Sequence, residues 1–290
     1  MTQPFWTHTI WYILLGVTTI AELAYVFIKA DNRKLMFALF LTFSGIAYFI
    51  EIQVLLVLKG YEYFPMIADR ISQVDDNILG NMFSQFSVAA TALLISHLKL
   101  KKYWYFLCAL IYGGIEELFL YLGIYKHYWY KTWMTIVGFT ILLWLLNILY
   151  RKAFRNPGRI YKYACAFFAV YTLFVHAISL PLRLIEPPPF KSLLPDEDVS
   201  VAVNVAANFL PLSISIMTAY YKRLKWPIHA VIIAVLYAAY CFAYTIGYII
   251  YNGMFALFAF ATLQIFGMYL FVHIVDRLYR FPKEKSLQRI

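Results

Sequence analysis

The sequence predicts an all-α fold, a polytopic transmembrane helical bundle of about nine spans, and three observations carry this prediction. Of the 290 residues, 63% are hydrophobic and 14% are charged, whereas a soluble domain is about 45–50% apolar and about 25% charged. The apolar residues form runs of about 20, the length that crosses a bilayer as a helix. Lys and Arg gather in every second connection between these runs, as the positive-inside rule expects.

The spans follow one another with short polar connections, and the whole chain, 1–290, is predicted to be one integral membrane domain. Residues 1–9 hold no Lys or Arg, so the first run lacks the basic region of a cleaved signal peptide and is predicted to remain as a helix. The predicted spans are 9–28, 35–58, 77–97, 103–125, 132–151, 161–183, 199–220, 227–251 and 254–276.

The distribution of basic residues predicts the orientation in a cell membrane. Of the 25 Lys and Arg residues, 19 lie in the first, third, fifth and seventh connections and in the C-terminal tail, 277–290. Because basic connections mark the cytoplasmic face, the N-terminus is predicted outside and the C-terminus inside. A chain of eight spans would place neighbouring basic clusters on opposite faces, which disfavours that count.

Two long outer connections differ from the inner ones. Residues 60–77 are aromatic and acidic, and residues 186–198 begin with an acid and three prolines and end in acids. Proline does not continue a helix, so both are predicted as interfacial loops, and the alternative is a pair of lids over an outward cavity. The aromatic stretch 125–133 is predicted to be a short turn at the membrane surface.

A weak internal repeat with a period near 125 residues relates the two halves. Glu51 corresponds to His176, and the helical pair Asn81 and Gln85 corresponds to Asn204 and Asn208. The interpretation is two four-helix units, about 9–125 and 132–251, followed by a ninth helix at 254–276. Since each unit has an even number of spans, the two units are predicted to be parallel.

The glutamate pair in the fourth span is the first candidate site. Glu116 and Glu117 interrupt an apolar run, and a carboxylate at that depth needs a proton, a partner or a water-filled cavity. Adjacent helical side chains point about 100° apart, so the two acids are not expected to face one small site together. The second half has no acid at the matching positions.

Further polar residues are predicted at similar depth in the outer half of the bundle. They are Glu51, His176, Asn81, Gln85, Asn204 and Asn208. One hypothesis is that they converge with the glutamate pair on a cavity that binds a proton, an ion or a small molecule. The alternative is that the amides join helices by hydrogen bonds and that His176 is a core residue.

A second polar layer is predicted near the inner face. It consists of Glu22, Asn147 and His273, each close to a basic connection. Here pairing with neighbouring Lys or Arg side chains is the favoured interpretation.

Other functional classes find little support in the residues. Cys108, Cys165 and Cys241 each lie in an apolar run without metal-ligand spacing, so we predict no metal site and no cofactor. The net charge of +10 is spread over short connections, which argues against nucleic-acid binding. The expected partners are the lipid bilayer and a small-molecule or ion ligand.

Three functions are compatible with this pattern. A small-solute or ion transporter, possessing a proton-coupled site in the outer polar layer, is favoured. A non-catalytic membrane sensor or assembly factor that uses the outer loops is the alternative. An intramembrane enzyme is the least favoured of the three.

The enzyme hypothesis depends on one local resemblance. Glu116-Glu117 is similar to part of the paired-glutamate motif of the prenyl-protein protease and bacteriocin-processing family. That family expects Arg four residues after the second Glu, where this chain has Tyr121, and the residues around His176 and His273 also differ from its His motifs. The resemblance therefore implies no more than that a Glu and a His could act as a general acid–base pair.

Overall fold

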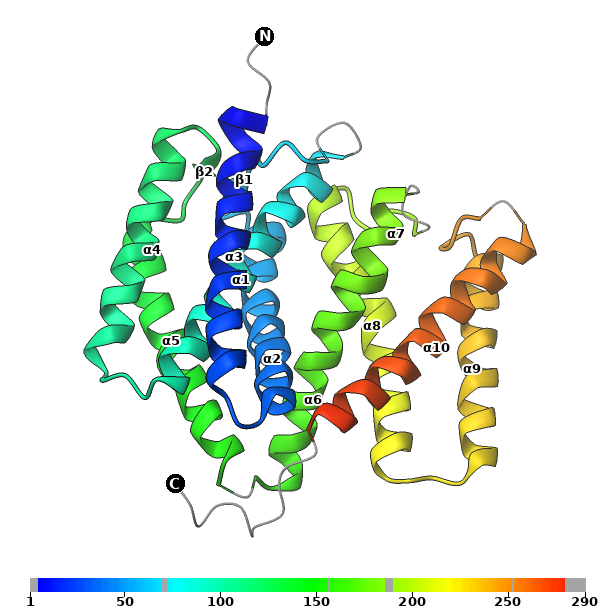
Figure 1. Ribbon diagram of the computed structural model, residues 1–290. Coiled ribbons are helices and arrows are strands. Elements are labelled where there is room, and N and C mark those ends of the chain that lie inside the picture. Colours follow the sequence, from blue (N-terminus) through cyan, green and yellow to red (C-terminus); the bar gives the residue numbers. More distant parts are fainter. Residues whose placement is uncertain (1–4, 69–71, 156, 186–189, 252, 280–290) are drawn as a thin grey trace.

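The computed structural model describes residues 5–68, 72–155, 157–185, 190–251 and 253–279, and it confirms the all-α prediction (Figure 1). The helices are α1 (Ile10–Lys29), α2 (Arg33–Ile52), α3 (Gln73–His97), α4 (Tyr103–Tyr121), α5 (Thr132–Ala153), α6 (Arg159–Phe174), α7 (Leu180–Ile185), α8 (Glu197–Tyr221), α9 (Trp226–Thr245) and α10 (Met254–Leu278). Three π-helical turns, Phe5–Thr9, Gln53–Val57 and Val175–Ser179, extend α1 and α2 and join α6 to α7.

Within the described residues these helices form nine rods, and eight of them are long and apolar enough to cross a membrane. The exception is α4, whose hydropathy is lowered by Glu116, Glu117 and several tyrosines. Figure 1 shows α4 running beside α5 along the height of the bundle. The predicted tail from residue 280 onward and part of the second outer loop, 186–189, lie outside the described residues.

Most predicted boundaries agree with the helices to within a few residues, and the differences have local causes. The third span begins at Gln73 rather than 77, because the side chain of Ser72 accepts a hydrogen bond from the backbone N–H of Asp75 and caps the helix. The fourth span ends at Tyr121, followed by Gly123 with a φ of 70°. A positive φ ends a helix readily at glycine.

The outer connections contain a short sheet that the sequence interpretation lacked. Strand β1 (Tyr61–Tyr63) pairs antiparallel with β2 (Tyr125–His127), so Tyr61 lies opposite His127 and Tyr63 opposite Tyr125. The residues predicted as a loop and an aromatic turn therefore form one structure. This sheet joins the outer end of α2 to the outer end of α4.

Helices α2 and α3 are the central rods, and α2 packs closely on α6. A side chain at Gly45 of α2 would collide with the backbone carbonyl of Phe168 in α6. Two threonine hydrogen bonds join α2 to α6 at the same contact, which we call the seam. Thr42 Oγ1 donates to the Cys165 carbonyl at 2.9 Å, and Thr172 Oγ1 donates to the Leu41 carbonyl at 2.7 Å. This seam holds the first half of the chain against the second.

Several landmarks recur at a separation of 124 positions. Helices α3 and α8 are both 25 residues long, and Ser72 and Asp196 cap them through side-chain hydrogen bonds. The further matches are Lys99 with Arg223 and Gly123 with Gly247, all at positive φ, and Tyr125 of β2 with Ile249, which bridges to Phe190. In packing, α1 lies along α3, and α2 lies between α3 and α6.

Candidate functional site

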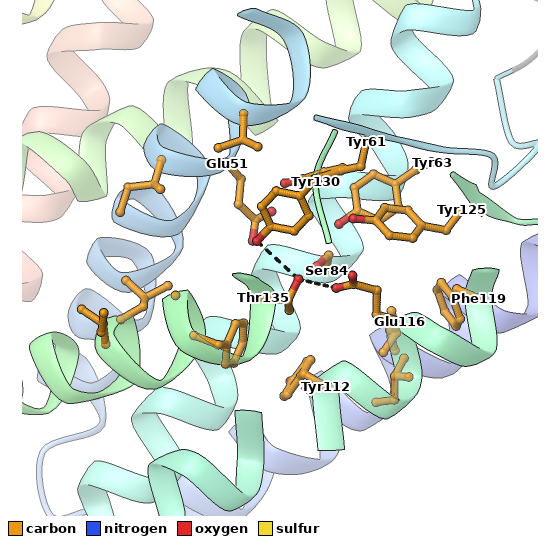
Figure 2. Close-up of a pocket in the computed structure, with 18 of the residues that line it drawn as sticks. Glu51, Tyr61, Tyr63, Ser84, Tyr112, Glu116, Phe119, Tyr125, Tyr130 and Thr135 are labelled. Carbon is orange, nitrogen blue, oxygen red and sulfur yellow. Dashed lines mark hydrogen bonds between the residues drawn. The ribbon is translucent and has the colours of Figure 1, made fainter. Parts of the chain in front are cut away.

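A cavity of about 230 Å³ lies at the end of the first half where the β1–β2 sheet is (Figure 2). Its walls come from α2, α3, α4 and α5, and the β1–β2 sheet closes one end. The polar and aromatic residues that line it are Glu51, Tyr61, Tyr63, Ser84, Tyr112, Glu116, Phe119, Tyr125, Tyr130, Thr135 and Phe139. Of the acids predicted in the outer layer, the cavity thus unites Glu51 and Glu116.

The strand register places tyrosines together at the closed end. Alternate residues of a strand share a face, so Tyr61 and Tyr63 point to the same side, and Tyr125 lies opposite Tyr63. The ring centroids of Tyr63 and Tyr125 are 4.8 Å apart, and those of Tyr61 and Tyr130 are 5.0 Å apart. Glu62, between the first two, points away and accepts a hydrogen bond from Tyr128 at 2.7 Å.

Burial raises the pKa of the Tyr61, Tyr63 and Tyr125 hydroxyls well above 10, and nearby carboxylates reinforce the shift. The same effects raise the pKa of Tyr130 to about 12. At neutral pH all four therefore keep their protons, and the closed end of the cavity presents uncharged phenols.

Glu116 is held from two sides. His127 Nε2 lies 2.7 Å from its Oε1, and Thr135 Oγ1 donates to its Oε2 at 2.5 Å. The Tyr130 hydroxyl lies 3.3 Å from the same threonine hydroxyl, so a short polar chain runs from the sheet to α4 (Figure 2). A carboxyl group held at both oxygens in this way is fixed in direction.

Glu51 differs from Glu116 because one of its oxygens has no partner. Its Oε2 is inaccessible to solvent and makes no hydrogen bond among the described residues. The residue lies just before the π-helical turn Gln53–Val57, and such turns are frequent at functional sites. An unpartnered carboxylate oxygen in an apolar bundle is costly, so Glu51 is the acid that a proton or a ligand can still neutralise.

Glu117 points away from the cavity. It lies on the exposed side of α4 and accepts a hydrogen bond from Thr132. The two adjacent glutamates thus occupy different surroundings, as helix geometry requires.

The structure brings Gln85 and His176 together, but outside the cavity. Gln85 Nε2 lies 2.8 Å from His176 Nε2, and His176 Nδ1 lies 2.9 Å from the Thr172 carbonyl. A carbonyl only accepts, so Nδ1 carries the proton and Nε2 accepts from the amide. Asn81, one turn before Gln85, is fully buried, and neither of its side-chain polar atoms has a partner among the described residues.

The amides of the second half lie elsewhere and are bonded. Asn204 Oδ1 accepts from Tyr248 at 2.7 Å, and Asn208 Oδ1 accepts from Tyr240 at 2.6 Å. Asn208 also donates to Gln264 of α10 at 3.2 Å. These bonds join α8 to the segments around it.

The inner polar residues form three separate groups rather than one layer. Both carboxylate oxygens of Glu22 lie 2.9 Å from Thr91 Oγ1. Asn147 donates to Ser96 at 3.0 Å, and His273 lies 3.0 Å from the Tyr220 hydroxyl. Among these groups, the partners are hydroxyls and not the Lys or Arg side chains that the sequence suggested.

The sequence interpretation missed the tyrosines, Thr135 and His127. A usable signal was the Tyr-Glu-Tyr alternation at 61–63 beside a second aromatic stretch at 125–130, because period-two aromatics indicate a strand. The pairing of two strands 64 residues apart had no such signal.

No protein-family model matches this chain, and neither a curated protein nor a solved structure is similar to it. Its function is therefore inferred from the geometry of the cavity.

Proposed function

We propose that this chain is an integral membrane protein that crosses the bilayer nine times and binds a small cation in the cavity around Glu51 and Glu116, as one step of transport. Glu51 Oε2 carries the proposal, because it is a buried carboxylate oxygen without a hydrogen-bond partner among the described residues, beside an open cavity. A bound cation or a proton would supply the missing partner.

Nine crossings are supported by the positions of the first and last helices. Figure 1 shows the start of α1 and the end of α10 at opposite ends of the bundle. An odd number of rods is needed for this, so α4 counts as a crossing despite its glutamates. The basic residues then favour an N-terminus outside and a C-terminus in the cytoplasm.

A cation is favoured over an anion by the charges at the cavity. Two carboxylates line it, and no Lys or Arg is among its lining residues in the described part of the chain. His127 already contacts Glu116, so Glu51 is the carboxyl group at the cavity that has an oxygen without a partner among the described residues. Tyrosine rings nearby add the favourable interaction that ammonium ions make with aromatic faces.

Transport is favoured over a purely structural role by the relation of the two halves. The landmarks that recur 124 positions apart support a parallel duplication with units α2–α5 and α6–α10, and such repeats are typical of transporters. Only the first unit carries the acids, so the binding site lies in one half. A proton and the cation would compete for Glu51, which provides a means of coupling.

The test compares binding of choline with binding of its uncharged carbon analogue, 3,3-dimethylbutanol, to the purified full-length chain. We expect measurable binding of choline only, and a loss of at least tenfold in Glu51→Gln and Glu116→Gln. Glu117→Gln is the matched control and should bind as the original does. Equal binding of both compounds, or choline binding that survives Glu51→Gln, would reject a cation site. Uptake into proteoliposomes then distinguishes a transporter from a sensor that only binds.

A further inference from the structure

We propose that the cavity receives the ammonium head of a single-chain amphiphile that enters from the lipid through an opening between α2 and α5. This inference rests on the cation site proposed above and adds the chemical class of its ligand. Three properties of the cavity support it: the sides that are closed, the side that is open, and the space inside.

The outer, water-facing end is closed by protein. The β1–β2 sheet covers it with the side chains of Tyr61, Tyr63 and Tyr125. Helix α1 holds this sheet in place, because the Tyr12 hydroxyl donates to the Ile124 carbonyl at 2.5 Å. The Phe64 N–H, just after β1, donates to the same carbonyl at 3.0 Å. A ligand dissolved in the outer water would have to displace this sheet.

The side between α2 and α5 is open and apolar. Ile50 of α2 and Ile141 and Leu145 of α5 line the cavity, yet they are 48%, 51% and 44% exposed. Side chains that line a cavity and also face outward mark its opening. Gly138 lies in the same wall, and a Cβ atom there would meet nothing within 4 Å.

In a membrane this opening faces hydrocarbon. All four residues lie within the rods that are apolar enough to span it, Arg33–Val57 and Thr132–Ala153. A strongly hydrated small ion gains nothing from an approach through hydrocarbon, whereas an amphiphile is already concentrated there. The carboxyl groups of Glu51 and Glu116 suit the ammonium head of such a molecule, and the apolar opening between α2 and α5 suits its hydrocarbon chain.

The volume limits what is held inside. A cavity of about 230 Å³ is smaller than the roughly 300–1,000 Å³ of a site for a drug-sized molecule. It therefore accommodates the head and its first carbons, with the rest of the chain lying between α2 and α5. A metal ion is a poorer match, since the described residues hold no group of three or more His, Cys, Asp or Glu that would coordinate one.

The experiment measures binding of tetramethylammonium, hexyltrimethylammonium and dodecyltrimethylammonium to the full-length chain in uncharged maltoside micelles, with Glu51→Gln and empty micelles as blanks. Each methylene that leaves water is worth about 0.8 kcal/mol, so Glu51-dependent affinity should rise about fourfold for each of the first added methylenes. Dodecyl sulfate and a neutral dodecyl glucoside should show no Glu51-dependent binding.

Two glycines provide the matched variants for the opening. Gly138 and Gly114 are both exposed helical positions where an added Cβ meets nothing within 4 Å, but only Gly138 lines the cavity. We expect Gly138→Leu to remove the dependence on chain length, and Gly114→Leu to retain it. Ile50→Trp obstructs the same opening from α2 and serves if Gly138→Leu does not fold.

The possible outcomes distinguish lateral entry of an amphiphile from the cation site on which it rests. Glu51-dependent binding of tetramethylammonium without any gain from a longer chain would overturn lateral entry and leave the cation site standing. Absence of Glu51-dependent binding throughout the series would overturn both. A chain-length dependence that persists in Gly138→Leu and Ile50→Trp would overturn entry between α2 and α5.

Discussion

His127 Nε2 lies 2.7 Å from Glu116 Oε1. This contact joins strand β2 to helix α4, the two elements that the turn at residues 122–124 connects. Both side chains are largely buried, at 12% and 10% exposed. The contact fixes the position of the sheet over the cavity and the direction of the Glu116 carboxylate at the same time. Stability and ligand binding should therefore both respond to His127.

Replacing His127 by Ala removes one of the two hydrogen-bond partners of Glu116. Leaving a buried charged group short of a partner costs about 1–3 kcal/mol, so His127→Ala should unfold at lower temperature and bind the cation more weakly. His127→Gln keeps an N–H donor and should recover part of both losses. Thermal unfolding and choline binding, measured side by side, check this. Unchanged unfolding in His127→Ala would show that the contact does not hold the sheet.

Asn81 and Gln85 should respond in opposite directions to the same substitution. Asn81 is buried with both polar atoms unpartnered among the described residues, so Asn81→Leu relieves a desolvation penalty of about 1–3 kcal/mol and should raise the unfolding temperature. Gln85→Leu removes the hydrogen bond to His176 and should lower it. Melting curves of the two variants and the original chain provide the measurement. Destabilisation by both variants would indicate that Asn81 has a partner, such as an internal water.

Asp75 and Arg183 form an ion pair that ties α3 to α7. Arg183 Nε lies 2.5 Å from Asp75 Oδ1, and the Asp75 side chain is only 2% exposed. Arg183→Met leaves that carboxylate buried and unpaired, which costs about 3–5 kcal/mol. Adding Asp75→Asn to Arg183→Met should restore most of this stability, as thermal unfolding would show. A double variant that unfolds as early as the single one would refute the pairing.

Lys59 forms ion pairs with two aspartates, and these make the stability of this part of the protein sensitive to acid. Its Nζ lies 2.5 Å from Asp196 Oδ2 and 3.4 Å from Asp198 Oδ2. The hydrogen bond from Lys59 lowers the pKa of the Asp196 carboxyl below its usual value. Because the folded-state pKa is lowered, the stabilisation is present above the unfolded pKa and is lost as pH falls through the folded value.

Lys59→Met should therefore lower the unfolding temperature slightly at pH 7 and leave it unchanged once both aspartates are protonated. Unfolding temperatures at a series of pH values, for the original chain and the variant, provide the measurement. A difference that persists in strong acid would mean that the Lys59 side chain acts through packing rather than charge.

The rods of the bundle were predictable from the sequence because their signal is local. A run of about 20 apolar residues and a capping side chain such as Ser72 both act within a few residues of the helix they define. The divergent directions of Glu116 and Glu117 also followed from helix geometry alone.

The sequence did not predict which neighbouring helix each polar side chain faces. That direction determines which residues share the cavity. The predicted repeat pairs Glu51 with His176, yet Glu51 faces the cavity whereas His176 bonds to Gln85. The face that a helix turns to each neighbour depends on packing between segments far apart in the chain. Both residues lie at a π-helical turn, Gln53–Val57 after Glu51 and Val175–Ser179 around His176, and such a turn changes the face that the residues beyond it present.

Gly45 lies where the two halves of the chain approach each other most tightly along α2 and α6. With no side chain there, α2 rests directly on the backbone of α6 beside Phe168, so the separation of the two helices is fixed at that level. Pulling the helices apart at this level would expose the buried threonine bonds of the seam. A larger residue at Gly45 would therefore disturb the contact between the two halves as well as the packing of one helix.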